Sequence, residues 1–533
     1  MTEFPTTQHA IQFVGPDTLV HNPAKEMDAL GPTQVLVKTE ACGICFSDTK
    51  LLHAWTSHPR KGPVLSGMSD ADLASIPSYR PGAQPGVPGH EPVGRIVAVG
   101  DAVTNLAVGQ RVLIQTDYRH LPTNGSNAAF GYNFEGALQE YVVIDERVAT
   151  DPATGESFLI PVSETPSASA VALIEPWACV EAAYAWAERQ HLKPGGRLLV
   201  LGAPDAGLAT SLVGRPDVTV AESLEGVDGS FDDIVYYGSD ADVVEALGPR
   251  LLPGGVLNIV LGGGRIDRPV QVDVGRVHYD GIRYCGTSGD VASEGWARIP
   301  ATCELEAGES VAIIGAAGPM GLMHTVRTAV SGIEGLSMDA IDVDDVRLAH
   351  LARVVAPIAE ANGVPTRFLN SRDTALEPGY QYVAVMVPAP ALVAQAVALA
   401  SEGGVVNAFA GFGKGTLAPL DVDAMVRKGI YIVGTSGSRI EDMVAVLAKV
   451  ESGTLDTNIS MDAITGMAGV QDAIDSVVNR TSGGKIMVYP MLPDLGLVRL
   501  ADLPSVMPEV AAQLVDGLWT RAAEEALLAS KQG

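Results

Sequence analysis

The sequence predicts an α/β protein in which a β-rich domain precedes two tandem modules, each with a doubly wound parallel sheet. Up to about residue 160, short apolar runs such as Val35–Val37 and Ile96–Val99 lie between glycines and prolines, which favours a small curved β-barrel. Beyond Lys193, apolar runs alternate with helical segments, and this alternation is typical of parallel sheets. The alternation occurs twice.

Composition limits the size of the protein and the partners it can have. The 533 residues, 47% hydrophobic and 18% charged, predict a globular chain with more than one domain. A formal net charge of −28 argues against nucleic acid and anionic membranes as partners. Five scattered cysteines indicate a reducing compartment, and neither a signal peptide nor a membrane span is expected, so we expect a cytoplasmic protein.

The elements that follow the β-rich domain can be placed in order. An alanine-rich helical segment is expected from Pro166 to Gln190. The first module should contain strands at Arg197–Leu201, Val218–Ala221, Asp233–Tyr237, Val256–Val260 and Ile282–Cys285. The second should contain strands at Val311–Ile314, Ser337–Ile341, Val364–Phe368, Tyr382–Val387, Val405–Ala408 and Ile430–Val433. Helices at Glu441–Ser452 and Val470–Asn479, a closing strand at Gly484–Pro490 and an amphipathic helical tail from Pro508 to Ser530 should complete the chain.

Two pairs of motifs indicate that the α/β pattern is an internal repeat. Gly254–Asn258 matches Gly403–Asn407, and Asp280–Gly289 matches Lys428–Gly437 at nearly the same spacing. We therefore predict five segments: a catalytic domain with a connecting helix at 1–192, a shortened first module at 193–290, a linker helix at 291–309, a second module at 310–437, and C-terminal helices, closing strand and tail at 438–533.

The segment Glu40–Asp48 carries the candidate chemistry of the first domain. Cys45, Ser47 and Asp48 lie within four residues of one another, and His90-Glu91 and Glu175 follow downstream. One sulfur, one imidazole and one or two carboxylates suit zinc, and three protein ligands leave an open position that is typical of catalytic zinc.

Other interpretations of these residues remain open. The Cys42–Cys45 spacing would also suit a redox pair or a structural zinc site. A buried apolar cysteine, a hydrogen-bonded core histidine and an acid at a helix N-terminus are the structural alternatives for Cys45, His90 and Glu175. We treat the nearby His53 and His58 as loop residues.

The second module contains the stronger dinucleotide fingerprint. Ala316-x-Gly318-x-x-Gly321 follows an apolar strand and precedes a helix, and Asp342 ends the next strand, where it would bond the ribose hydroxyls and favour NAD over NADP. The expected cofactor-binding residues before Asp342 are Gly315, Ala316, Gly318, Pro319, Met320 and Gly321. An ordinary strand–helix turn is the alternative. In the first module, Gly202 and Gly207 have altered spacing, and we interpret it as a degenerate copy that no longer binds cofactor.

Together these motifs resemble the zinc-dependent medium-chain dehydrogenase/reductase family, and within it the polyol and sugar dehydrogenase branch. The motifs Cys-Gly-Ile-Cys-Phe-Ser-Asp, Gly-His-Glu, Gly-Gln-Arg-Val, Glu-Pro-Trp-Ala and Gly-Lys-Ile-Met-Val occur in the family's order. The resemblance implies a GroES-like catalytic domain, Rossmann modules, and zinc bound by Cys45, His90 and Glu175. Glu91 is similar to the family carboxylate that ligates zinc directly or through water, so the direct carboxylate ligand stays open. We expect Ser47 to take the substrate proton and Asp48 to orient His90.

The chain also departs from the family pattern. Thr116–Gly136 has no cysteine for a structural zinc, the frequent histidine is Lys50, the Cys45–His90 loop is long, and the α/β module is duplicated.

The expected function is NAD- and zinc-dependent oxidation of a secondary alcohol of a polyol, cyclitol or sugar, or the reverse reduction. In the loop, Arg60, Lys61 and Arg80 could bind a substrate phosphate or could be solvated charge. A homo-oligomer, dimer or tetramer, is expected. The alternatives are a zinc-free quinone-oxidoreductase-like NAD(P)H reductase and a non-catalytic nucleotide-binding scaffold.

Overall fold

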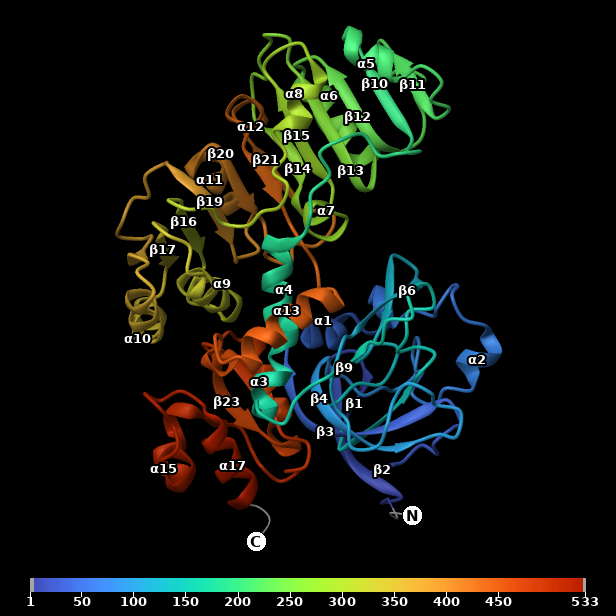
Figure 1. The fold of residues 1–533 in the computed structure, drawn as a ribbon, viewed down its shortest axis with the longest axis vertical. Helices are drawn as coiled ribbons and strands as arrows, with labels where there is room; N and C mark the ends of the chain where they lie inside the picture. The colour runs from blue at the N-terminus through green and yellow to red at the C-terminus, as the bar shows by residue number, and fades with distance from the viewer. Residues whose placement is uncertain (1–3, 531–533) are drawn as a thin grey trace. The chain divides into compact units, whose positions relative to one another are not determined.

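The computed structural model describes residues 4–530, which form two compact units. The first unit combines the chain up to Ala178 with the chain from Ser438 onward, and the second is Cys179–Gly437. In Figure 1 the C-terminal elements from α13 onward, coloured orange to red, therefore belong to the same unit as the blue N-terminal strands. Segments at opposite ends of the sequence build one domain.

An eight-stranded sheet is the centre of the first unit and confirms its predicted β-rich character. Its strand order is β25-β23-β24-β3-β4-β5-β9, and β8 also pairs with β3. The bounds are β3 (Gln34–Ile44), β4 (Glu91–Val99), β5 (Arg111–Ile114), β8 (Tyr141–Asp145), β9 (Leu159–Pro161), β23 (Met461–Thr465), β24 (Lys485–Val488) and β25 (Val498–Arg499). Two hairpins accompany the sheet: β1 (Thr7–Gly15) with β2 (Thr18–Glu26), and β6 (Asp117–Thr123) with β7 (Ser126–Ala129).

The predicted closing strand is confirmed as β24, and its partner is β3. The two strands are antiparallel, with Ile486 opposite Ile44 and Val488 opposite Cys42. On its other side β3 pairs with β4, with Gly43 opposite Glu91. Since Cys45 directly follows β3 and His90 directly precedes β4, this register gathers three distant motifs at one end of the sheet.

The long segment between Cys45 and His90 is ordered. It contains α1 (Phe46–Ala54), two short 3₁₀ turns at Trp55–Ser57 and Pro59–Lys61, and α2 (Asp70–Ala74). The buried Lys61 ammonium donates to the carbonyl oxygens of Arg80 and Gln84, and burial lowers its pKa to about 8. Lys61 therefore connects the turn at Pro59–Lys61 to the later part of this segment.

Besides α1 and α2, the described part of the first unit contains seven α-helices, of which α4 continues into the second unit. They are α3 (Ala168–Ala172), α4 (Ile174–Ala185), α13 (Ile440–Glu451), α14 (Val470–Val478), α15 (Leu503–Val506), α16 (Pro508–Ala511) and α17 (Arg521–Ser530). The helical segment predicted from Pro166 to Gln190 is divided into α3 and α4 and ends at Ala185. The prediction of a helical tail from Pro508 to Ser530 is wrong in its middle. Asp516 and Gly517 both have positive φ angles, and this turn interrupts the helix.

The second unit contains two parallel sheets, as predicted. The first has the order β11-β10-β12-β13-β15, and the second has the order β18-β17-β16-β19-β20-β22, which is the doubly wound arrangement. The first sheet consists of β10 (Leu198–Leu201), β11 (Val218–Ala221), β12 (Phe231–Tyr237), β13 (Leu251–Val260) and β15 (Arg283–Thr287). The second consists of β16 (Ser310–Ile314), β17 (Ser337–Asp342), β18 (Thr366–Asn370), β19 (Tyr380–Val385), β20 (Ala400–Asn407) and β22 (Tyr431–Val433).

The helices of the second unit connect these strands. In the first module they are α5 (Ala206–Ser211), α6 (Ala241–Leu247), α7 (Val274–Tyr279) and α8 (Ala292–Ala297). In the second they are α9 (Pro319–Val330), α10 (Asp345–Ala361), α11 (Pro390–Leu399) and α12 (Val422–Lys428). Within the predicted linker helix at 291–309, only α8 is helical, and it packs on β13 and β15 of the first module.

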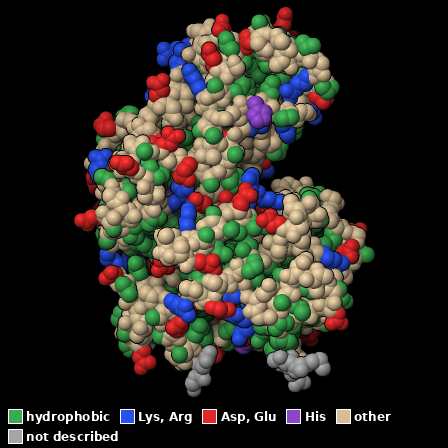
Figure 2. All heavy atoms as spheres, viewed as in Figure 1, with side chains coloured by type: hydrophobic (Ala, Val, Ile, Leu, Met, Phe, Trp, Pro, Cys, Tyr) green, Lys and Arg blue, Asp and Glu red, His purple; other side chains and the backbone are tan. Residues whose placement is uncertain are grey.

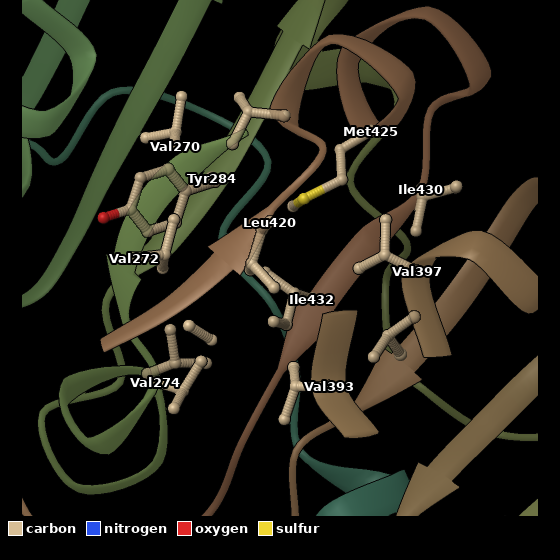
Figure 3. Close-up of a cluster of buried hydrophobic side chains, with 14 of the residues drawn as sticks. Val270, Val272, Val274, Tyr284, Val393, Val397, Leu420, Met425, Ile430 and Ile432 are labelled. Carbon is tan, nitrogen blue, oxygen red and sulfur yellow. The ribbon is translucent and has the colours of Figure 1, made fainter. Parts of the chain in front are cut away.

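One additional strand pair joins the two modules. The strands β14 (Val270–Asp273) and β21 (Leu417–Leu420) are antiparallel partners that the sequence analysis did not identify. Behind them lies a hydrophobic core to which both modules contribute, and Figure 3 shows Val270, Val272 and Tyr284 beside Leu420 and Ile432. The two modules are therefore packed as one body.

The molecular surface mixes charges of both signs. On the face seen in Figure 2, Asp and Glu side chains lie among Lys and Arg side chains. None of the helices described between residues 4 and 530 is long and apolar enough to cross a membrane.

We expect Glu524→Ala to destabilise the first unit. The buried Glu524 carboxylate accepts hydrogen bonds from Ala168 N and Ser169 N at 2.6 and 2.8 Å and from the Tyr489 hydroxyl at 2.9 Å. Leaving these donors unsatisfied should cost about 2 kcal/mol or more, measured by denaturant unfolding.

The neighbouring Glu525→Ala is the matched control. Glu525 forms an exposed ion pair with Arg521, whose removal should change stability by less than about 1 kcal/mol. Equal effects of the two substitutions would contradict the role of Glu524.

Candidate metal and dinucleotide sites

Cys45, His90 and Glu91 form the only group of three or more metal-ligating side chains found among residues 4–530. One candidate ligand atom from each residue lies within 4.8 Å of the other two. Cys45 stands between β3 and α1, and His90-Glu91 stands at the start of β4. The structure therefore brings these three predicted residues together.

Asp48 forms hydrogen bonds with two members of this group, His90 and Cys45. Its Oδ1 lies 3.0 Å from Nδ1 of His90, and its Oδ2 accepts a hydrogen bond from Cys45 N at 2.9 Å. Because Nδ1 faces a carboxylate, Nε2 is the ring nitrogen left for a metal. Burial opposes protonation of His90, but Tyr132 and Asp48 outweigh it and raise its pKa well above the usual value.

Glu91 lies beside a buried lysine that the sequence analysis missed. Lys485 Nζ of β24 donates to Glu91 Oε1 at 2.5 Å, and both side chains are almost fully buried. Although burial opposes it, the charges of Glu91, Cys45 and Glu175 raise the pKa of Lys485. A charged residue that opens the apolar run Ile486–Val488 was the available sequence signal.

The second carboxylate oxygen of Glu91 is ready to accept a ligand. Oε2 is buried and has no hydrogen-bond partner among the residues that the structure describes. A Cβ at Gly43 would come within 2.1 Å of Oε2, so the glycine provides the space for this carboxylate. An unsatisfied buried oxygen beside a thiol and an imidazole fits a bound cation. A sulfur, a nitrogen and an oxygen donor together suit zinc.

Glu175 and Ser47 lie near this group but outside the three-residue cluster. Glu175 is buried in the first turn of α4; burial raises its pKa to about 7, Glu91 also raises it, and His90 and Lys485 lower it. Glu175 thus interacts electrostatically with the candidate ligands His90 and Glu91. Ser47 is half-buried in the first turn of α1.

Aromatic and cationic side chains surround His90. The ring centroids of His90 and Tyr132 are 5.3 Å apart, and His58 lies 5.2 Å from Tyr132. Burial and the nearby Arg60 lower the pKa of His58 to about 4. His58 therefore contributes to the surroundings of the site. His53 is an exposed partner of Asp17, but it lies in the last turn of α1, so the prediction that it is a loop residue is wrong.

The three loop cations considered for phosphate binding have partners within the protein. Arg60 lies 3.4 Å from Asp117, and Arg80 lies 3.7 Å from Asp28. Lys61 donates to two carbonyl oxygens. Their charges are thus used in holding the loop.

The second module has an open dinucleotide fingerprint. Gly315, with a φ of +85°, directly follows β16, and α9 begins at Pro319 with Met320 in its first turn. Gly318 is the N-cap, no side chain caps this helix, and a Cβ on Gly318 would meet no atom closer than 3.7 Å. A Cβ on Gly321 would come within 2.2 Å of Gly315 O. These glycines keep a helix N-terminus accessible to an anion.

Asp342 lies where the fingerprint requires an acid. It ends β17, next to β16, and its Oδ2 accepts a hydrogen bond from Ala317 N at 3.1 Å. Ala316 of the same loop is fully buried. The acid therefore holds the glycine-containing loop against the strand.

The corresponding helix end in the first module is closed. Asp205 caps α5, and its Oδ1 accepts from Gly207 N and Leu208 N at 2.9 and 3.0 Å. Its Oδ2 accepts from Tyr237 Oη at 2.7 Å and Ala292 N at 2.9 Å. The Asp205 carboxylate thus occupies the backbone N–H groups at this helix end, to which a phosphate would otherwise bind.

Known proteins share both parts of this architecture. The alcohol dehydrogenase GroES-like domain matches residues 31–151. Mannitol-1-phosphate 5-dehydrogenase of Aliivibrio fischeri is 29% identical over 249 residues, 42% of this chain and 57% of that protein. (R,R)-butanediol dehydrogenase of Bacillus subtilis is 29% identical over 210 residues, 36% of this chain and 51% of that protein. The chain thus spans about half the length of these curated relatives.

A solved structure extends the likeness in fold. The structure of 2R,3R-butanediol dehydrogenase from Bacillus subtilis covers 91% of this chain and 100% of its own, with a TM-score of 0.53 and 17% identity. The first domain is GroES-like, and the two parallel sheets of the second unit form Rossmann-type modules. The chain therefore contains a segment similar to the alcohol dehydrogenase GroES-like domain, and it resembles these dehydrogenases in partial sequence and in fold.

We expect Cys45→Ala to remove bound zinc and Cys42→Ala to retain it. Cys45 belongs to the donor cluster, whereas Cys42 is a fully buried thiol within β3. Elemental analysis of the purified variants should give about one zinc per chain for Cys42→Ala and far less for Cys45→Ala. If only Cys42→Ala lost its zinc, the thiolate ligand would be Cys42 and the assignment to Cys45 would be wrong.

Proposed function

We propose that this protein is a zinc- and NAD-dependent dehydrogenase that acts on a secondary alcohol of a polyol, cyclitol or sugar. The observation that carries the proposal is the convergence of Cys45, His90 and Glu91, with one buried carboxylate oxygen left without a partner. The two curated relatives are dehydrogenases of a sugar alcohol phosphate and of a diol, which supports the substrate class.

The residues of the chain divide the work as follows. Cys45, His90 and a carboxylate, Glu91 or Glu175, would hold the zinc, and bound zinc acts as a Lewis acid that lowers the pKa of an alcohol. Asp48 keeps Nε2 of His90 available to it by accepting from Nδ1. The Ser47 hydroxyl, which both accepts and donates, would receive the proton of the substrate hydroxyl.

The second module would bind NAD, which accepts the hydride from the carbinol carbon. Its open helix N-terminus would face the pyrophosphate, and Asp342 would bond the ribose hydroxyls and repel a 2′-phosphate. The Asp205 carboxylate argues against a second cofactor in the first module.

An unphosphorylated substrate suits the site better than a phosphorylated one. Arg60 and Arg80 already face carboxylates, and Lys61 is buried against carbonyl oxygens. Binding a phosphate would require these internal interactions to be broken.

A panel of polyols, cyclitols, sugars and their phosphates tests the function, with NAD or NADP and the zinc-loaded protein. We expect NADH formation with an uncharged polyol or cyclitol. Equal rates with the matching phosphate would contradict the substrate proposal. No turnover with any compound at full zinc loading would contradict the dehydrogenase itself and favour a nucleotide-binding scaffold.

Gly318→Val should abolish NADH binding without unfolding the protein. The added side chain has room within the protein but occupies the space in front of the α9 N-terminus. Fluorescence titration should show at least about a hundredfold loss of affinity, a cost of about 2.7 kcal/mol.

Gly207→Ala in the first module is the control. Its Cβ would contact Asp205, which already fills that helix end, so NADH affinity should stay unchanged. Loss of binding in Gly207→Ala but not in Gly318→Val would place the cofactor in the first module.

A further inference from the structure

The two modules of the second unit can be aligned residue by residue. Asp280–Gly289 repeats as Lys428–Gly437. Continuing the same register backward aligns the N-cap residues Asp273 and Asp421 of α7 and α12, and it aligns Gln271 with Pro419. Contacts between the modules can therefore be tested for symmetry.

The strand pair β14–β21 has this symmetry. Gln271 pairs with Pro419, which is its own equivalent in the repeat. On either side, Val270 pairs with Leu420 and Val272 pairs with Ala418. Since Val270 is equivalent to Ala418 and Val272 to Leu420, the two pairs exchange under a twofold rotation. The axis passes between Gln271 and Pro419.

Close packing between the modules is reciprocal as well. A Cβ on Gly286 of β15 would come within 2.9 Å of the Val426 side chain of α12. A Cβ on the equivalent Gly434 would come within 2.8 Å of His278 Cα in α7, and His278 is the equivalent of Val426. Each module therefore places the same helix against the end of the same strand of the other.

The end strands of the two sheets also meet near this axis. β15 and β22 are neighbours, α12 packs on β15, and α7 packs on β22. Arg283 and Tyr431 are equivalent residues at the starts of β15 and β22, and both bind Glu188. The Glu188 carboxylate accepts from Arg283 Nε at 2.9 Å and from Tyr431 Oη at 2.5 Å.

Reciprocal contacts of this kind define a twofold, self-complementary interface, in which residue i of one half meets residue j of the other and j meets i. We propose that the first module is a built-in dimerisation partner for the second, so that one chain supplies both halves of a twofold pair. The exposed edges of β15 and β22 and the short strands β14 and β21 are then closed within the chain. A homo-oligomer of this protein must use a different surface.

The pair is symmetric in packing and asymmetric in ligand sites. The Asp205 carboxylate fills the helix end of the first module, whereas the equivalent helix end at Gly318 is open. The first module thus keeps the interface of a dinucleotide-binding module without its anion site. This inference concerns assembly and does not depend on the proposed dehydrogenase activity.

Cysteine cross-linking at the axis distinguishes an internal pair from a pair between chains. Gln271 and Pro419 are exposed and directly opposite each other in an antiparallel ladder, where Cα atoms lie about 4.5–5.5 Å apart, within disulfide range. The full-length variants are Gln271→Cys, Pro419→Cys and the double variant, oxidised with diamide beside the unsubstituted protein. Non-reducing electrophoresis and peptide mass mapping report the products.

We expect a disulfide between positions 271 and 419 within one chain in the double variant, and no covalent dimer of either single variant above the unsubstituted protein. In a twofold dimer of two chains, position 271 would face position 271 of the second chain. Efficient covalent dimers of Gln271→Cys or Pro419→Cys alone would therefore overturn the proposal. Interchain links in the double variant would overturn it as well.

Discussion

The register in which β3 pairs with β4 and β24 is the constraint on which the candidate metal site depends. It places Gly43 opposite Glu91 and brings Lys485 beside the same carboxylate. Burying a carboxylate is costly unless a cation and hydrogen bonds compensate it. Lys485 compensates one oxygen of Glu91, and the other is left for a second cation beside Cys45 and His90. A shift of one residue in β24 would turn the Lys485 side chain to the opposite face of the sheet.

The same strand pairing explains why both ends of the chain are needed for one domain. β24 lies about 440 residues after β3 in the chain, yet it is a direct neighbour of that strand. Between them the chain forms a separate unit that contains both α/β modules. Duplication of the module thus enlarges the second unit and leaves the eight-stranded sheet in the first.

Much of the site was predictable because its motifs are local. Cys45, Ser47 and Asp48 lie on one helical turn, His90-Glu91 is a dipeptide, and the family order of the motifs links them. The charge of Lys485 at the start of an apolar run was visible in the sequence, but its pairing with Glu91 was not, because a lysine at the start of a strand usually faces water. Only the long-range pairing of β24 with β3 shows that it is buried.

The fold was predictable where hydrophobic runs are long. The parallel strands of both modules were identified, but β14 and β21 were missed because Val270–Asp273 and Leu417–Leu420 are only four residues long and the second contains a proline. The pairing of β14 with β21 depends on the repeat, which is visible in the sequence. It also depends on the twofold packing of the two modules, which the sequence does not show. In the first module, the sequence showed only an altered spacing between Gly202 and Gly207. It did not show that the Asp205 carboxylate occupies the N-terminus of α5.

X-ray absorption at the zinc K-edge of the purified protein tests the central claim most directly. The account predicts one sulfur at about 2.3 Å together with nitrogen and oxygen neighbours at about 2.0–2.2 Å. A first shell without sulfur, or one with two or more sulfurs, would contradict a site built from Cys45, His90 and a carboxylate.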